Sequence, residues 1–545
     1  MKNWRVNSIF TVFFLIVVAI ISRLVFLQIL NGDFYKALSQ GLHISFTETS
    51  QDRGEIFSKE GRPFAINIDW PFVFTNPQKI KNTEETVKLL SETLGFKEEF
   101  VLEKLSANTS YSLLKRKLTE EEFDAVGKLD INGVYLGREK GRYYPQEALS
   151  SHIIGFLGAE GFGQYGLEES YNDILSQKDG FTENKKGSDL FLTIDYNIQF
   201  EAERLLQKAK EDIDIKKGQI LVLEPNSGKV LAMADLLSFD PNHYEDYARK
   251  GNLEVFKNRA SQELFEPGSV FKAVTMAAAL EEEKVSPKTT YIDKGSVKIN
   301  NYTIYNYEQR IYEEPQTMTN VLEKSINTGV IFVQKQLGQN LFLKYIEDFG
   351  FFEPTGIDIQ ETYSTNKELK TGREINLATA SFGQGIEITP IQLMRAYCAI
   401  ANGGKLVTPY LVEKSIDSEN IISLYEEEND KRIISSKTAS QLTAMLVSVI
   451  ENGFGKKAKI PGYFIAGKTG TAQVSFGALG IDKAGYSDKT IQSFIGFAPA
   501  FNPQFLVLVK LDDPKTKTAE YSATPIFKEL TEYIINYYQI PPDYE

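Results

Sequence analysis

The run Glu-Pro-Gly-Ser-Val-Phe-Lys at residues 266–272 places a hydroxyl group and an amine three residues apart. A serine hydroxyl becomes a good nucleophile only when a neighbouring base removes its proton. On a helix, side chains three residues apart lie on one face and can reach each other. Pro267 and Gly268 interrupt the chain before Ser269, and an alanine-rich helical pattern follows Lys272. We therefore expect Ser269 at a helix N-terminus, where free N–H groups favour a developing negative charge.

Two further runs carry hydroxyl, amide and amine groups: Ser325-Ile326-Asn327 and, much later, Lys468-Thr469-Gly470-Thr471. Each run alone has an ordinary structural explanation. Ser325 and Asn327 are residue types that cap helices, here one beginning near Thr328, and Lys-Thr-Gly fits the exit of an edge strand. Ser-x-x-Lys, Ser-x-Asn and Lys-Thr-Gly in this order resemble the signature set of the penicillin-binding proteins and serine β-lactamases. The structural explanation would require three coincidences in the right order.

The N-terminal residues have the pattern of a membrane anchor. Lys2 and Arg5 precede an apolar run that continues, interrupted by Arg23, to Leu30. Residues 8–30 as one helix would be about 34 Å long, enough to cross a bilayer with some tilt. A cleavable signal peptide is the alternative, but no small-x-small cleavage site follows the run. We expect a single-pass protein of the inner (cytoplasmic) membrane, with its N-terminus in the cytoplasm and its catalytic part outside.

Composition excludes several classes of function. The chain has 545 residues, long enough for two or three domains, and a net charge of −13 that argues against a nucleic-acid partner. The three histidines show no ligand spacing, so we expect no metal site and no cofactor. Cys398 is the only cysteine, which excludes an intrachain disulfide, and its apolar helical surroundings indicate a core residue.

The pattern along the chain predicts an α/β fold. Short elements come first, including a helix over 83–94 and a capping box at Thr119, and a polar, glycine-containing stretch at 176–189 indicates a domain boundary. The second part should hold an antiparallel sheet covered by helices, with Ser269 on a mostly helical insertion facing the Lys468 strand. Its expected elements are an amphipathic helix near 196–212, strands at Gln219–Leu223, Val230–Ala234, Tyr463–Val474, Ser493–Ala498 and Phe505–Leu511, and a final helix near 524–538.

The chain resembles the class B penicillin-binding proteins nearly from end to end. Motifs around Arg53-Gly54-Glu55, Arg142-x-Tyr144-Pro145 and Gly163-x-x-Gly166-Leu167-Glu168 are similar to those of that family's N-terminal pedestal domain, although residues 57–60 depart from the first motif. The resemblance implies a cytoplasmic tip and transmembrane anchor at 1–31, a mixed α+β pedestal of the dimerisation type at 32–190, and a transpeptidase domain at 191–545. It also implies that the pedestal motifs join subdomains and do not catalyse.

The resemblance further implies a role for each signature residue. Ser269 attacks a D-alanyl-D-alanine stem peptide of peptidoglycan and forms an acyl-enzyme, and Lys272 is the base. Because the usual pKa of lysine is about 10.4, burial or the neighbouring Lys468 must lower the pKa of Lys272. Ser325 would relay a proton to the leaving amine and Asn327 would hold Lys272 and the substrate amide. The remaining roles fall on the third motif: Lys468 and Thr469 bind the substrate carboxylate, Gly470 lets the strand approach the substrate, and Thr471 shares an oxyanion hole with the Ser269 N–H.

Function at the level of the cell follows from the same resemblance. The chain should cross-link glycan strands and not polymerise them, because no glycosyltransferase-type domain precedes Ser269. Phe265–Ser269, Phe382-Gly383-Gln384-Gly385 and the Arg23–Gln28 pattern look most like the septal, cell-division branch. An elongation-branch transpeptidase and a penicillin-binding scaffold or sensor with little catalysis remain the alternatives. Implied partners are peptidoglycan stem peptides, β-lactams as inhibitors, a membrane glycan polymerase and proteins of the division complex.

Overall fold

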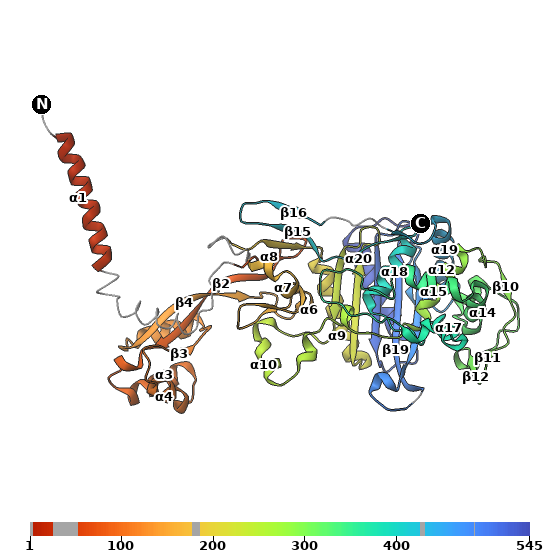
Figure 1. Ribbon diagram of the computed structural model, residues 1–545, viewed down its shortest axis with the longest axis horizontal. Helices are drawn as coiled ribbons and strands as arrows, with labels where there is room; N and C mark the ends of the chain where they lie inside the picture. The colour runs from red at the N-terminus through yellow and green to blue at the C-terminus, as the bar shows by residue number, and fades with distance from the viewer. Residues whose placement is uncertain (1–3, 26–52, 177–185, 426–430, 484, 545) are drawn as a thin grey trace. The chain divides into compact units, whose positions relative to one another are not determined.

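The computed structural model describes residues 4–25, 53–176, 186–425, 431–483 and 485–544 (Figure 1). These residues form two compact units. The first contains residues 67–143, and the second contains residues 53–66 and everything from Tyr144 onward.

A single helix, α1 (Trp4–Val25), covers most of the predicted anchor. Residues 26–30, the end of the predicted span, lie outside the described residues. Within the described ranges, none of the helices combines the length and the apolar character that crossing a membrane requires.

The first unit packs short helices against a small antiparallel arrangement of strands. The helix predicted over 83–94 is confirmed with the same bounds, and it buries Val87, Leu90 and Leu94 on one face. Thr119 forms the predicted capping box with Glu122. The elements of this unit are the later part of β2 (Pro63–Thr75), η2 (Pro77–Lys79), α3 (Thr83–Leu94), α4 (Glu98–Ser106), β3 (Ser112–Lys115), α5 (Glu120–Lys128) and β4 (Val134–Tyr143).

The first elements of the second unit bring residues of all three pedestal motifs together. The Arg53 guanidinium donates to the Glu168 carboxylate over 2.6 Å, and both residues are buried. The Tyr144 hydroxyl donates to the other Glu168 oxygen over 3.2 Å. The motif residues are thus joined by a buried ion pair, as expected of residues that link segments. The surrounding elements are β1 (Ile56–Phe57), α6 (Ser151–Ile154), β5 (Phe156–Leu157), β6 (Gly163–Gln164), α7 (Gly166–Ser170), α8 (Asn172–Ser176), β7 (Asp189–Leu192), β15 (Val412–Ile416) and β16 (Ile422–Leu424).

A five-stranded antiparallel sheet forms the centre of the second unit, in the order β18-β19-β20-β8-β9. Strands from opposite ends of this unit therefore lie side by side, the yellow β8 next to the blue β20 (Figure 1). Alternate residues supply two cores, because successive side chains of a strand point to opposite faces. The bounds are β8 (Lys217–Leu223), β9 (Val230–Asp235), β18 (Ala466–Ser475), β19 (Tyr486–Ala498) and β20 (Phe505–Asp512).

Helices cover both faces of this sheet. Ile220 and Val222 pack with α9 (Tyr196–Ile213) and α20 (Ala523–Tyr537), whereas Leu221 and Leu223 point into the larger core on the other face. That larger core contains α12 (Lys272–Glu281), α18 (Pro390–Ala401) and α19 (Ser436–Asn452). The predicted α/β architecture, an antiparallel sheet covered by helices, is therefore confirmed.

The segment between β9 and β18 is mostly helical, as predicted. Cys398 lies on α18 with no exposed surface, which confirms it as a core residue. The other elements of the insertion are η3 (Pro241–His243), α10 (Tyr244–Arg249), η4 (Leu253–Phe256), α11 (Arg259–Gln262), η5 (Gly268–Phe271), β10 (Thr290–Tyr291), β11 (Ser296–Ile299), β12 (Tyr302–Tyr305), η6 (Tyr307–Gln309), β13 (Gln316–Thr317), α13 (Met318–Glu323), α14 (Asn327–Leu337), α15 (Gln339–Asp348), α16 (Lys367–Lys370), α17 (Glu374–Ala380), β14 (Lys405–Leu406), β17 (Lys431–Arg432) and η7 (Lys456–Ala458).

Two predicted boundaries near the Lys468 strand are wrong. β18 begins at Ala466, three residues after the predicted start, because Tyr463 forms only an isolated bridge with Ile460. β19 begins at Tyr486, seven residues before the start at Ser493 that the sequence predicts, and its first residues pair with the end of β18. Several residues of this extension, such as Asp488 and Lys489, are exposed and polar, so they lack the apolar pattern that predicts a strand.

The buried pair of Arg53 and Glu168 makes the first testable prediction. Glu168→Gln should lower the free energy of unfolding by about 3–5 kcal/mol, because the Arg53 charge stays buried without its partner. Chemical unfolding of the purified protein measures this change. Glu120→Gln, which removes an exposed partner of Arg138, is the control and should leave the unfolding curve unchanged. Equal losses in the two variants would contradict the importance of burial.

Candidate active site

Ser269 lies on η5, the single turn that leads directly into α12 at Lys272. The expected placement at the start of a helix is confirmed. Gly268 adopts a left-handed backbone with φ 63° and donates its N–H to the Gly383 carbonyl over 2.9 Å. Ser269 is half-buried on this turn.

Lys272 joins the first two signature runs. Its side chain has no exposed surface. Its amine donates to the Ser325 carbonyl over 2.6 Å, to the Ser325 hydroxyl over 3.1 Å and to Asn327 Oδ1 over 2.7 Å. An ammonium group can donate all three of these hydrogen bonds, whereas a neutral amine can donate only two of them.

Lys468 joins the third run to the same serine. It lies on β18, again without exposed surface, and its amine donates to the Ser325 hydroxyl over 3.0 Å and to the Thr469 carbonyl over 3.0 Å. The Ser325 hydroxyl therefore accepts hydrogen bonds from both lysines. Residues that are far apart in the sequence meet at one oxygen atom.

The backbone at Ser325 is in an unusual conformation. Its φ is 51°, in the left-handed region that non-glycine residues seldom adopt, and such strain gathers at functional sites. The capping explanation of this run is wrong, because α14 begins after Ile326 without a side-chain cap. Asn327 directs its oxygen to Lys272 and donates its amide to the Tyr305 carbonyl over 3.1 Å. Ser325 and Asn327 thus hold lysine amines and adjacent backbone.

Burial changes the ionisation of both lysines. Removal from water lowers the pKa of Lys272 well below its ordinary value, and the nearby charge of Lys468 lowers it further. Burial lowers the pKa of Lys468 to about 7. Two cations so close together disfavour each other's charge. Burial therefore disfavours the charged form of both amines, and the neighbouring cation adds to this effect at Lys272.

The third run lies directly against the turn that carries Ser269. A β-carbon at Gly470 would lie 3.0 Å from a Val270 methyl carbon and 3.2 Å from the Pro267 carbonyl oxygen. The structure thus adds a packing reason for this glycine to the predicted approach of substrate. Thr469 is almost completely buried, and the Thr471 hydroxyl accepts a hydrogen bond from the Ala519 N–H over 3.3 Å.

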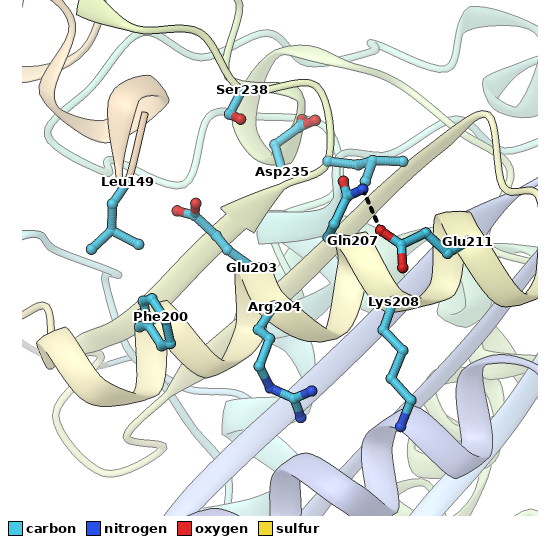
Figure 2. Close-up of a pocket in the computed structure, with 10 residues that line it drawn as sticks. Leu149, Phe200, Glu203, Arg204, Gln207, Lys208, Glu211, Asp235 and Ser238 are labelled. Atoms are coloured by element: carbon cyan, nitrogen blue, oxygen red, sulfur yellow. Dashed lines mark hydrogen bonds between the residues drawn. The ribbon is translucent and has the colours of Figure 1, made fainter. Parts of the chain in front are cut away.

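A cavity of about 610 Å³ lies elsewhere, along α9 and the end of β9. Figure 2 shows Glu203 and Asp235 directed toward it, while Arg204 and Lys208 extend away, where they pair with Glu529. Burial raises the pKa of Glu203 to about 7. However, one Glu203 oxygen already accepts from Ser150 and Gln199, and Asp235 pairs with Arg259. None of the signature residues lines this cavity.

A serine at a helix start, a buried lysine three residues later and a second buried lysine on the edge strand define the class of penicillin-binding serine acyl-enzymes. Comparison with protein families agrees: residues 218–532 match the penicillin-binding protein transpeptidase domain, and residues 48–189 match the penicillin-binding protein dimerisation domain. The chain belongs to the penicillin-binding proteins, as the sequence predicts.

Individual relatives extend over nearly the whole chain. Stage V sporulation protein D of Bacillus subtilis is 33% identical over 94% of this chain and 82% of its own length. Peptidoglycan D,D-transpeptidase FtsI of Buchnera aphidicola is 29% identical over 99% of this chain and 96% of its own length. Among solved structures, penicillin-binding protein 3 of Mycobacterium tuberculosis in complex with aztreonam has a TM-score of 0.72 and 25% identity, covering 91% of this chain and 98% of that one.

The pKa of Lys272 leads to a prediction about charge and basicity. Lys272→Arg keeps a cation but cannot accept a proton. Acylation by a fluorescent penicillin should therefore fall by about 10²-fold or more, the usual contribution of a general base. Lys335→Arg, at an exposed lysine paired with Glu374, is the matched control. Retention of most of the acylation rate in Lys272→Arg would assign the base to another group.

The pKa of Lys468 predicts a pH dependence. As the pH rises through about 7, the Lys468 ammonium loses its charge, and the second-order rate constant of acylation should fall about tenfold per pH unit. In Lys468→Arg the charge persists, so this falling limb should be absent up to about pH 9. Stopped-flow acylation between pH 5 and pH 9 measures both profiles. An unchanged falling limb in Lys468→Arg would show that another group titrates.

Proposed function

We propose that the chain is a peptidoglycan D,D-transpeptidase that acts through an acyl-enzyme at Ser269. One observation carries this conclusion: the Ser325 hydroxyl and carbonyl bind the buried Lys272, and the same hydroxyl binds the buried Lys468. This contact assembles all three signature runs into one site. Such burial of two amines has a cost in free energy, which is understandable in a site that needs one of them as a base.

In the proposed acylation step, the neutral Lys272 amine takes the Ser269 proton as the serine oxygen attacks the carbonyl carbon of the penultimate D-alanine. The tetrahedral oxyanion collapses, the peptide bond breaks, and the terminal D-alanine leaves as an amine. Ser325 relays the proton from Lys272 to that leaving nitrogen. The hydroxyl is suited to this task because it contacts Lys272 over 3.1 Å and Lys468 over 3.0 Å.

The β18 strand supplies the binding groups of this proposal. The Lys468 ammonium and the Thr469 hydroxyl receive the terminal carboxylate of the donor peptide. The N–H groups of Ser269 and Thr471 form the oxyanion hole, in which each donor contributes about 10²–10³ in rate. Gly470 keeps this stretch of strand free of a side chain, and Asn327 holds Lys272 and the substrate amide.

The second half of the reaction decides between transfer and hydrolysis. In our proposal the amine of a second stem peptide attacks the acyl-enzyme, regenerates Ser269 and leaves a cross-link. A β-lactam mimics the donor end and acylates the same serine. The dimerisation domain favours transfer over β-lactamase activity, because a free-standing hydrolase has no need of it.

We further propose that the protein works at the inner membrane in septal synthesis, beside a membrane glycan polymerase and other division proteins. The apolar residues of 8–30 after Lys2 and Arg5 support an uncleaved anchor with the catalytic part outside, and the FtsI relative supports the septal branch. The proposed domains are 1–31, 32–190 and 191–545. Recovery of full-mass protein in the membrane fraction, with the Ser269 domain open to protease only from outside, tests the topology.

Replacement of the native protein by Ser269→Ala tests the function. The variant should keep its mid-cell position, because placement depends on the N-terminal parts, yet septal cross-linking should stop and cells should form filaments. Fluorescence microscopy and muropeptide composition measure the two effects, with the wild-type gene as control. Rounded, bulging cells would indicate the elongation branch. Normal division without a compensating paralogue would leave only the scaffold alternative.

A further inference from the structure

An exposed ion pair links the two sides of the proposed site. Lys517, in the segment after β20, lies 2.5 Å from a Glu308 carboxylate oxygen. The two residues are separated by most of the helical insertion and three strands of the sheet. Chain neighbours of Glu308 are bound to Asn327 and Thr328, on one side of the lysine pair. Chain neighbours of Lys517 are bound to β18, on the other side.

Glu308 belongs to a short turn, residues 306–310, that is held against the Asn327 side. The Tyr305 carbonyl accepts from the Asn327 amide. The buried Asn306 accepts from both the N–H and the hydroxyl of Thr328, each over 3.1 Å. A displacement of this turn would therefore pull directly on the residues that hold Lys272.

The turn is also strained. Glu308 and Gln309 have φ values of 53° and 55°, both in the left-handed region that costs about 1 kcal/mol or more for residues other than glycine. Arg310 pairs with the second oxygen of Glu308 over 2.5 Å and stacks on the Tyr307 ring. This arrangement presents the Glu308 carboxylate outward, in position for Lys517.

Lys517 belongs to a segment that is held against β18 and β19. The Ala519 N–H donates to the Thr471 hydroxyl. Thr516 exchanges two hydrogen bonds with the Gln492 side chain, each 2.8 Å long. Gln492 is the direct partner of Thr471 across the two strands. Lys517 thus belongs to a segment that is bound to the strand carrying Lys468, Thr469 and Gly470.

A second link between the same two sides is the hydrogen bond from Lys468 to the Ser325 hydroxyl. That link uses the groups that must engage substrate during the proposed reaction, so it is interrupted when they do. The pair of Glu308 and Lys517 uses no group of the proposed chemistry. The ion pair can therefore persist throughout the proposed reaction and keep the distance between Asn327 and β18 constant.

We propose that Glu308 and Lys517 are positioning residues. They hold the turn of residues 306–310, and with it Asn327, at a constant distance from β18 while the groups of the site are engaged with substrate. This inference rests on the proposed function of Ser269. Misplacement of reacting groups by as little as 1 Å can lower rates strongly. An exposed pair stabilises its arrangement only modestly, so we expect an effect of about two- to fivefold on acylation.

A double-mutant cycle on the full-length protein tests this proposal. Glu308→Gln, Lys517→Met and the double variant are compared by the second-order rate constant for covalent labelling of Ser269 with a fluorescent penicillin. Each single change should lower the constant about two- to fivefold, and the double variant should be no slower than the slower single variant. Lys517→Arg should retain the wild-type rate. The ratio of the wild-type rate constant to that of each single variant should decrease as the salt concentration is raised from about 0.05 to 1 M, because salt screens exposed ion pairs.

A matched control lies two residues away in the same segment. Lys515 is as exposed as Lys517, and it forms an ion pair with Asp214 over 2.9 Å. Asp214 contacts neither the Asn327 side nor the β18 side of the site. Lys515→Met should leave labelling unchanged, and none of the variants should shift the thermal unfolding temperature enough to explain a slower rate. Strictly multiplicative effects in the cycle, or equal loss in Lys515→Met, would overturn the proposal. Absence of labelling in the wild type would instead overturn the proposed function.

Discussion

The organisation of the second unit depends on two lysine amines buried around one serine hydroxyl. Neither lysine has exposed surface, and both donate to Ser325. A buried cation is costly unless hydrogen bonds compensate for the lost water or the group gives up its proton. Here both remedies operate, since each amine is hydrogen-bonded and each pKa is lowered. Burial thus lowers the pKa of both amines, as the base of the proposed mechanism requires.

Holding such a pair requires rigid elements on every side. Lys272 begins a helix whose residues from Ala273 to Leu280 are all buried, so the helix cannot turn to expose its amine. Lys468 is fixed by pairing of β18 with β19 along almost its whole length. Between them, Ser325 adopts a strained φ that directs both its carbonyl and its hydroxyl to the lysines. The apolar cores on the two faces of the sheet supply the stability that this arrangement needs.

Much of this arrangement could be predicted from the sequence, and there is a physical reason why the other features could not. Helical spacing places Lys272 one turn after Ser269, and continuous apolar runs indicate the central strands, because the local sequence decides both. The left-handed φ of Ser325 has no local signal, since serine seldom adopts it and only the two lysines require it. The start of β19 could not be predicted either, because exposed polar residues such as Asp488 and Lys489 lack the apolar pattern of a strand. The link from Glu308 to Lys517 joins distant segments, which no local pattern can reveal.

In the third run, packing against the turn of Ser269 restricts the residue types more tightly than the proposed chemistry alone would. Lys468, Gly470 and Ala472 point to one side of β18, because side chains alternate along a strand. On that side lies the turn of Ser269: a β-carbon at Gly470 would press on Val270, and one at Gly268 would lie 2.9 Å from the Ala472 methyl carbon. An amine, a hydrogen atom and a methyl group therefore follow in order along the strand. A slip of one residue would place threonine side chains against the turn and remove the amine from Ser325. The spacing between Lys468 and Gly470 is thus fixed by the fit of the strand to the turn as much as by the needs of substrate.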